Sequence, residues 1–425
     1  MAAPSRPEQS DPERADPDQF EPEQSGLRFG RRGLLGAGLG GLAIAGGVGL
    51  AGCTGEDEPD GPDPQDPRQR TWSPHDTHQA GITSPLPAAS TTIALDLVSG
   101  TTKDALRRLL TLWSHDIEAL MAGTPVPGDP MPDLARPGTS LSVTVGFGPR
   151  VFTIPGLTQH KPDGLAEVAP MNHDRLRPEW SGGDLVLLIS ADDATTVGYA
   201  QRVLTRDAAT FATVRWVQEG HWRGLDDQGR PATGRNLFGQ LDGTGNVVAN
   251  TAETIWSPDP PAWFTGGTTM VVRRIEMNLT TWDEVVRDRQ ELSMGRRLDT
   301  GAPLTGGQEH DDLNLGATNE QGTPVIALNA HARLAHPSQN GGRTMFRRAY
   351  NYTHTEPAAK GPAKSTAGLV FISFQTSVPG VFTPIQKRLD ASDALNEWTT
   401  TIGSAVFAIP GGFPRGGIIA AGLFD

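Results

Sequence analysis

The stretch from 330 to 352, AHARLAHPSQNGGRTMFRRAYNY, holds residue types that can act on a metal and on a reacting oxygen. His331 and His336 precede a turn, and a neutral imidazole nitrogen is a common metal ligand. Arg347 and Arg348 follow the turn, and an arginine stays cationic when buried, so it can stabilise developing negative charge. By themselves, such residues are more often surface histidines and ordinary ion-paired arginines.

A carboxylate between glycines lies upstream, in the sequence GQLDGTGN from 239 to 246. Asp242 in this stretch is a candidate for moving a proton between two atoms of a substrate. Asp-Gly is also a common turn dipeptide, so a turn residue is the alternative interpretation. The neighbouring glycines would let the backbone approach a flat ligand closely.

The order of these motifs resembles that of the dye-decolourising (DyP-type) peroxidases, which are haem enzymes, and in particular their branch exported by the twin-arginine route. The resemblance rests on Gly-x-x-Asp-Gly, then Ala-His-x-Arg-x-Ala-His-Pro, then Arg-Arg-x-Tyr-Asn-Tyr, and it runs from about Thr77 to the C-terminus. Four shorter pieces also match: HQAGI (78–82), SGGDL (181–185), GAPL (301–304) and QKRL (386–389). Gly-x-x-Asp-Gly alone is a weak pattern, whereas the ordered set is specific.

The resemblance implies a role for three residues around a haem b iron. His331 matches the proximal ligand, Asp242 the distal acid and Arg347 the distal arginine. His336 remains the alternative ligand on chemistry alone. Arg348 competes with Arg347, although neighbouring residues on one element point to different faces, so that only one should reach the iron.

Further residues are expected around the cofactor. The resemblance places Gly243, Thr244, Gly245, His336, Pro337 and Ser338 along the haem edge. Arg296 is the expected partner of a haem propionate, the alternative being a solvated arginine. Leu369 and Phe371 lie two apart on a strand and share a face, which suits either the distal side of haem or core packing.

An acid behind the ligand would make its imidazole more anionic, because the other ring nitrogen of a metal-bound histidine is usually held by an acceptor. Asp393 is the candidate and Glu397 the reserve, both on an expected helix from 391 to 400. The other histidines, among them His173, are interpreted as structural or exposed.

The activity implied is that of an exported haem-b peroxidase. It reduces hydrogen peroxide through a ferryl intermediate and oxidises one-electron donors such as dyes, phenolics, or a protein or metal partner. The alternative is a haem-binding protein for iron release or haem delivery, similar to a deferrochelatase. Such a protein would need His331 but not Asp242 and Arg347 together.

Two ferredoxin-like domains are expected to position these residues, at 86–247 and 248–425. Periodicity predicts strands from Thr91 and at 141–147, 184–190 and 213–220, with helices at 103–121 and 194–206. That order is a split βαβ unit. Strands at 267–277, 369–375 and 404–409, with helices at 281–292 and 391–400, repeat it in part. The resemblance implies an α+β fold of the dimeric α+β barrel type, with the two antiparallel sheets packed together.

The amino-acid composition excludes some classes of binding partner and of metal site. The net charge is −13, with no basic run outside the N-terminal region, which argues against nucleic-acid binding. The single cysteine, Cys53, excludes an intrachain disulfide and any multi-cysteine metal site.

The first 52 residues are interpreted as an export signal, followed by a flexible tether at 53–85. Twin arginines in FGRRGLL (29–35) precede an apolar run rich in glycine and alanine, which predicts the twin-arginine export machinery as a partner. A plain membrane anchor is the alternative, although the run is rich in glycine for a permanent span.

Cys53 follows Leu-Ala-Gly, and this sequence resembles a bacterial lipobox; the alternative is ordinary cleavage nearby. The mature chain would then be secreted, or tethered to the outer face of the cytoplasmic membrane through a lipid on Cys53 alone.

Overall fold

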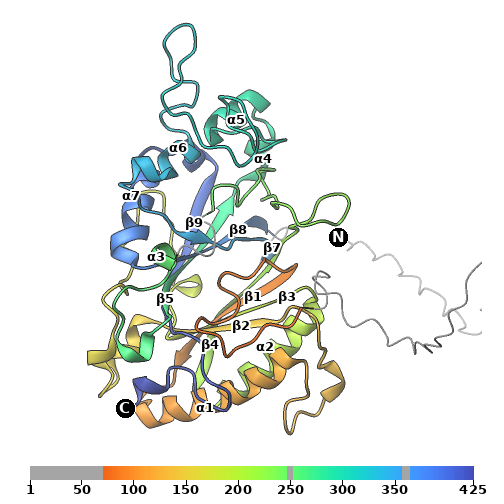
Figure 1. Cartoon of the computed structure of the whole chain (residues 1–425), viewed down its shortest axis with the longest axis vertical. Coiled ribbons are helices and arrows are strands. Elements are labelled where there is room, and N and C mark those ends of the chain that lie inside the picture. Colours follow the sequence, from red (N-terminus) through yellow and green to blue (C-terminus); the bar gives the residue numbers. More distant parts are fainter. Residues whose placement is uncertain (1–69, 247–251, 357–363) are drawn as a thin grey trace, which may run out of the picture. The chain divides into compact units, whose positions relative to one another are not determined.

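The computed structural model describes residues 70–246, 252–356 and 364–425 (Figure 1). The expected export signal, Cys53 and the first part of the expected tether lie outside these residues. From 70 onward the tether segment packs on the sheet: Ile82 is fully buried, and Gln79 donates hydrogen bonds to the carbonyls of Val145 and Pro410. Within the described parts, every helix is too short or too polar to cross a membrane.

The N-terminal half has the expected split βαβ order. It consists of β1 (Ala89–Leu97), α1 (Lys103–Ala122), β2 (Ser142–Phe147), β3 (Leu185–Ala191), α2 (Ala194–Ala208) and β4 (Ala212–His221). Its strands lie in the antiparallel order β2-β3-β1-β4. Helix α1 forms as predicted because its apolar residues recur at helical spacing and are buried against the sheet. It begins at the capping hydroxyl of Thr102 and ends at Gly123, whose φ of 67° is the left-handed conformation that glycine allows.

The C-terminal half repeats this arrangement with longer insertions. Its strands are β5 (Thr268–Met277), β7 (Tyr350–Glu356), β8 (Lys364–Gln375) and β9 (Thr399–Ile409), in the order β9-β5-β8-β7. The two-residue strand β6 (Phe346–Arg347) pairs with β8. The helices are α3 (Ala252–Ile255), α4 (Leu279–Asp283), α5 (Arg287–Met294), α6 (His331–Ala335) and α7 (Thr383–Ser392).

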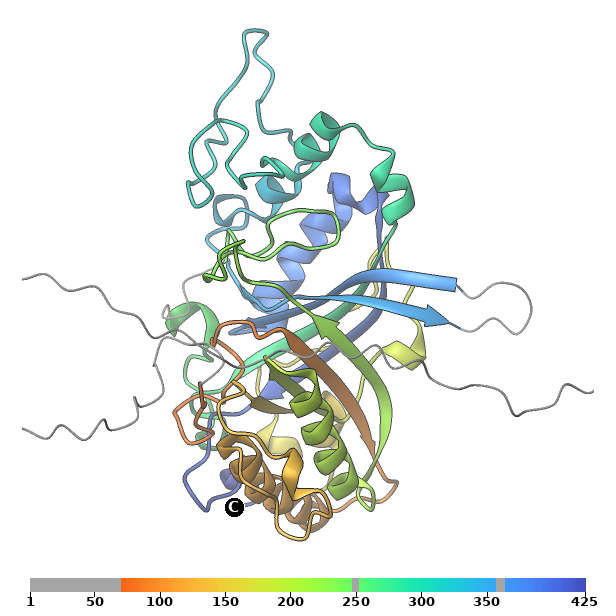
Figure 2. The same ribbon diagram turned by 90° about the vertical axis from the view of Figure 1, so that its right-hand side faces the viewer.

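The two half-sheets join at both of their edges and close into a barrel. Strand β2 pairs with β9 at Phe147 and Ala408, and β4 pairs with β7 at His221 and Asn351. The expected α+β barrel of two ferredoxin-like units is therefore confirmed. Both views place α1 and α2 at one end of the sheet and α4, α5 and α6 at the other (Figures 1 and 2). The second end holds the motifs that carry chemistry.

Two predicted helices in this half are wrong in detail. The helix expected at 281–292 is two helices, α4 and α5, separated at residues 284–286. The helix expected at 391–400 lies instead at 383–392: α7 ends at Ser392, a 3₁₀ turn covers Ala394–Glu397, and β9 starts at Thr399. Three consecutive threonines at 399–401 favour a strand because β-branched side chains fit a pleated sheet. Helix α7 begins at Thr383, and Pro384 fits its first turn because the backbone N–H groups of that turn need no partner within the helix.

Candidate active site

A cavity of about 580 Å³ lies among α6, α7, β5, β8 and the 236–245 loop. It brings together most of the residues singled out in the sequence: Asp242, Gly243, Thr244, Gly245, Arg296, His331, His336, Pro337, Arg347, Leu369, Phe371 and Asp393. Ser338 does not line the cavity; its hydroxyl lies 2.9 Å from Nδ1 of His336. Residues as far apart in the chain as Asp242 and Asp393 therefore meet at one cavity.

His331 is the first residue of α6 and is held by Asp393. Its Nδ1 atom lies 2.6 Å from Oδ2 of Asp393, while Oδ1 of the same carboxylate accepts a hydrogen bond from the Leu395 amide at 2.9 Å. This second bond caps the 3₁₀ turn and fixes the orientation of the carboxylate. Burial alone would lower the pKa of His331, but the charge and hydrogen bond of Asp393 outweigh it and raise that pKa. Within the described parts of the chain, Nε2 of His331 has no partner and is available to a ligand in the cavity.

His336, the rival ligand, has both ring nitrogens engaged. Nε2 lies 2.7 Å from Oδ1 of Asp312, and Nδ1 accepts a hydrogen bond from the Ser338 amide at 3.2 Å. Because neither nitrogen is free, His336 suits a place at the cavity rim better than ligation.

Asp242 and Arg347 form a pair on the cavity wall. The Nη1 atom of Arg347 lies 3.8 Å from Oδ1 of Asp242, and Oδ2 of Asp242 accepts a hydrogen bond from the Asn236 side chain at 3.3 Å. Asn246 clamps the backbone of Arg347 through two hydrogen bonds, each 2.8 Å long. The role of Asn246 was missed in the sequence, although the residue stands directly in the Asp-Gly-Thr-Gly-Asn motif.

Arg348 points elsewhere. Its side chain is fully buried and donates to the carbonyl of Ser84 at 2.5 Å and to that of Pro85 at 3.5 Å. Adjacent positions on an extended chain face opposite sides, so Arg347 lines the cavity and Arg348 ties the 84–85 segment to the barrel.

Arg296 follows the glycine cap of α5 and lines the same cavity. Nη1 donates to the carbonyls of Gly301 and Glu309 at 2.9 and 2.7 Å, and Nη2 donates to that of Asp311 at 3.1 Å. Burial lowers the pKa of Arg296, and the neighbouring carboxylates of Asp312, Glu309 and Asp311 act against that shift. Among the residues that the structure describes, two N–H groups of the guanidinium, on Nε and Nη2, have no partner and can bind another acceptor.

Much of the remaining wall is apolar. Leu369 and Phe371 of β8 lie beside apolar side chains from β5 and α7 and from the segments next to them: Ile275, Met277, Phe382, Ile385 and Leu389. Gly243 has a φ of 134°, a conformation that side chains rarely adopt, so the loop stays thin where it meets the cavity.

Two other residues, Glu397 and His173, complete the comparison with the sequence. Glu397, the reserve acid, is on the surface and pairs with Arg289 at 2.7 Å. His173, interpreted as structural or exposed, is half-exposed and lies 3.0 Å from Asp390, and it also lines the cavity, which the sequence did not predict. No local signal could reveal this, since the two residues are 217 positions apart.

Comparison with known proteins supplies the family. Sequence models of the N-terminal and C-terminal parts of DyP-type peroxidases match residues 79–222 and 233–413. A dye-decolorizing peroxidase of Thermobifida fusca is 38% identical over 350 residues, which is 78% of this chain and 80% of that protein. A deferrochelatase of Escherichia coli K12 is 30% identical over 398 residues, covering 88% of this chain and 92% of the other.

Solved structures agree. The crystal structure of a DyP-type peroxidase from Cellulomonas bogoriensis has a TM-score of 0.79 and 46% identity, covering 84% of this chain and 99% of that one. Ferric DtpA from Streptomyces lividans gives a TM-score of 0.80 and 38% identity, covering 84% and 98%. The α+β barrel of this chain is therefore the fold of DyP-type peroxidases. The chain belongs to the DyP-type peroxidase family, and it is accordingly a haem-dependent oxidoreductase.

Proposed function

We propose that this chain is an exported haem-b peroxidase in which His331 binds the iron and Asp242 and Arg347 act on hydrogen peroxide. The observation that carries the proposal is the presence of two pairs, His331 with Asp393 and Asp242 with Arg347, on the wall of one cavity.

The residues of the cavity fit haem. An imidazole with a free Nε2 is the ligand that haem iron takes in peroxidases. The apolar wall with Leu369 and Phe371 suits a flat macrocycle, and the thin loop at Gly243, Thr244 and Gly245 allows close approach. His336 and Pro337 line the same cavity, which supports their proposed place at the haem edge, and Ser338 contacts His336 from outside the cavity. The free N–H groups of Arg296 suit a propionate.

When bound, the haem supplies the iron that receives peroxide and the electrons that break its O–O bond. Asp242 takes the proton from one peroxide oxygen and delivers it to the other, which leaves as water. Arg347 keeps its charge throughout and offsets the negative charge that develops on the departing oxygen. Asn246 positions that guanidinium through the backbone, and Asp393 holds the His331 ring and makes it a stronger ligand.

The electron donors proposed are small one-electron reductants such as dyes and phenolics, or a protein or metal partner, in line with the name of the Thermobifida fusca relative. Iron release or haem delivery is the second candidate, favoured by the deferrochelatase relatives. That activity needs a haem ligand but gives no use to the Asp242–Arg347 pair, which favours the peroxidase.

Export by the twin-arginine route and lipidation at Cys53 complete the proposal. Twin arginines at 31 and 32 precede an apolar run that ends beside the single cysteine. Twin-arginine export carries folded proteins, which suits a chain that must take up its cofactor in the cytoplasm.

The test is an absorption spectrum followed by peroxide and donor. The purified protein should show a Soret band, its spectrum should change on adding one equivalent of hydrogen peroxide, and a dye should return it to the resting form. A Soret band that peroxide leaves unchanged would support haem delivery, and absence of any Soret band would contradict both candidates.

A further inference from the structure

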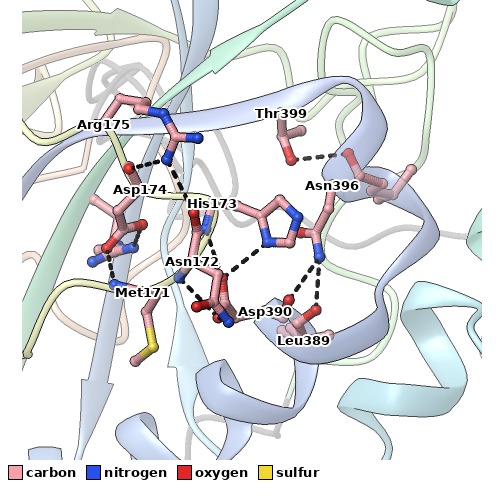
Figure 3. A network of polar contacts seen from close by, with 11 residues as sticks. Met171, Asn172, His173, Asp174, Arg175, Leu389, Asp390, Asn396 and Thr399 are labelled. Carbon is pink, nitrogen blue, oxygen red and sulfur yellow. Dashed lines mark hydrogen bonds and ion pairs between the residues drawn. The ribbon is translucent and has the colours of Figure 1, made fainter.

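A polar part of the cavity wall has no role in the chemistry above. It is formed by His173, Asp174, Arg273, Asp390, Asn396 and Thr399, which we name the His173 cluster (Figure 3). Its residues come from the 171–175 loop of the N-terminal half and from β5, α7, the 3₁₀ turn at Ala394–Glu397 and the start of β9. They line the same cavity as His331.

The imidazole ring of His173 is oriented by Asp390. Its Nδ1 atom lies 3.0 Å from Oδ1 of Asp390, and that buried carboxylate also accepts hydrogen bonds from the backbone amides of His173 and Asn172. Burial alone would raise the pKa of Asp390, but these hydrogen bonds outweigh it and lower that pKa, so the carboxylate is ionised. An ionised carboxylate can only accept, so Nδ1 of His173 carries a hydrogen, and in the neutral imidazole Nε2 then carries the lone pair.

Nε2 of His173 is free and accessible. It has no partner among residues 70–246, 252–356 and 364–425, and the side chain is 48% exposed while it also lines the cavity. His173 therefore stands at a mouth of the cavity, in contact with both solvent and interior.

The neighbouring groups are acceptors as well. Asn396 donates its amide hydrogens to the carbonyls of Leu389 and Asp390, and Thr399 donates its hydroxyl hydrogen to the carbonyl of Leu395 (Figure 3). This leaves an amide oxygen and a hydroxyl oxygen to accept. The charge of Arg273 is directed at Asp174, with a second bond to Ser404 at 3.2 Å. A ligand complementary to this wall brings a hydroxyl donor.

We propose that the His173 cluster binds a phenolic electron donor and that His173 is the base for its oxidation. The inference rests on the proposed peroxidase function, which supplies the oxidant. In each turnover step the phenol O–H bond breaks: the proton passes to Nε2 of His173, the electron passes to the oxidised cofactor, and a phenoxyl radical leaves. A base in hydrogen-bond reach matters because a phenol that loses an electron alone becomes a strong acid.

The experiment compares guaiacol, which loses a proton with its electron, and ferrocyanide, which loses an electron only. In the haem-loaded protein, His173→Gln should oxidise guaiacol roughly 100-fold more slowly, the lower end expected for loss of a general base. Ferrocyanide should be oxidised at the wild-type rate. The matched control is His115→Gln, because His115 is also an exposed histidine held by an aspartate, at 2.9 Å from Asp116, and does not line the cavity.

A binding measurement without peroxide gives a readout independent of activity. Calorimetric titration of guaiacol into the resting haem-loaded protein should show an affinity roughly threefold to tenfold weaker in His173→Gln, the effect of one lost hydrogen bond. Asn396→Leu provides a second variant that should weaken guaiacol binding in the same way.

Each outcome decides the proposal. If His173→Gln oxidises and binds guaiacol as the wild type does, the proposal is overturned. An equal loss of rate with guaiacol and ferrocyanide would also overturn it, because His173 would then only stabilise the 171–175 loop. If the wild-type protein itself oxidises neither donor, the proposed peroxidase function fails instead, and the two failures are thereby distinguished.

Discussion

Nδ1 of His331 lies 2.6 Å from Oδ2 of Asp393, across 62 positions of the chain. The other oxygen of Asp393 caps a 3₁₀ turn, so the carboxylate has a fixed orientation toward the ring. Three residues earlier in the chain, Asp390 holds His173 in the same way. The C-terminal end of α7 thus orients two imidazoles toward one cavity.

Removing the proposed ligand should remove the cofactor. His331→Ala should purify with little haem and without a normal Soret band, since the iron loses its protein ligand. His336→Ala is the matched control and should keep its Soret band, because both nitrogens of His336 are already engaged. The reverse result, with haem lost only from His336→Ala, would transfer the ligand role to His336.

Neutralising Asp393 should change the midpoint potential of the haem iron. In Asp393→Asn the imidazole loses its anionic partner, so the ferric form loses stabilisation and the midpoint potential should rise. Spectroelectrochemical titration of the haem measures this. Glu397→Gln changes only an exposed pair with Arg289 and should leave the potential unchanged. An unchanged potential in Asp393→Asn would show that Asp393 does not tune the ligand.

The Asp242–Arg347 pair should act as a unit on peroxide. Asp242→Asn and Arg347→Leu should each slow the peroxide-dependent change of the haem spectrum by roughly 100-fold or more. The double variant should lose less than the product of the two effects, because the groups lie 3.8 Å apart and serve one step. Stopped-flow mixing tests this.

The control for that pair is a second arginine–aspartate pair, Arg230 with Asp226, which lies at the surface at 2.7 Å. Arg230→Leu with Asp226→Asn should react with peroxide at the wild-type rate. A fully multiplicative loss for Asp242 and Arg347 would mean that they serve separate steps.

Stability should depend on pH through Asp207, near the end of α2. Burial, followed by the hydrogen bond and charge of Asp116, raises the pKa of Asp207 from 3.8 to about 7. Between pH 3.8 and about pH 7, the Asp207 carboxyl has lost its proton in the unfolded chain but keeps it in the folded chain. Stability therefore falls as pH rises through this window, and the loss is complete above about pH 7.

Asp207→Asn removes this penalty, so its melting temperature should exceed that of the wild type at pH 8 and equal it at pH 3.5. Thermal denaturation at both pH values measures the difference, with the exposed Asp227→Asn as control. An equal gain at both pH values would assign the effect to packing rather than to charge.

Cys53→Ala should release the mature protein from the membrane fraction, because Cys53 is the only site for an acyl chain of the lipobox type. Fractionation followed by immunoblotting measures this. Arg31→Lys combined with Arg32→Lys should instead leave the protein in the cytoplasm. Membrane association that persists in Cys53→Ala would favour an uncleaved anchor.

The sequence by itself determined the fold class and the family. Helix α1 was predictable because the spacing of its apolar residues is a local property that matches one helix face. The ordered motifs around Asp242, His331 and Arg347 indicated a DyP-type haem peroxidase, which the family comparisons confirm. Local sequence patterns did not predict elements whose conformation depends on tertiary contacts. Strand β7 was not predicted, and the helix expected at 391–400 lies at 383–392.

Only the tertiary structure decided which atoms meet. The closure of the barrel joins Phe147 to Ala408 and His221 to Asn351, pairings that no local pattern encodes. The choice between Arg347 and Arg348 depends on contacts with Asn246 and Ser84, and the place of His173 depends on Asp390, 217 positions away. Such contacts form only after segments distant in the sequence have packed against each other. Their contribution to stability therefore depends on both segments together, and neither segment alone encodes it.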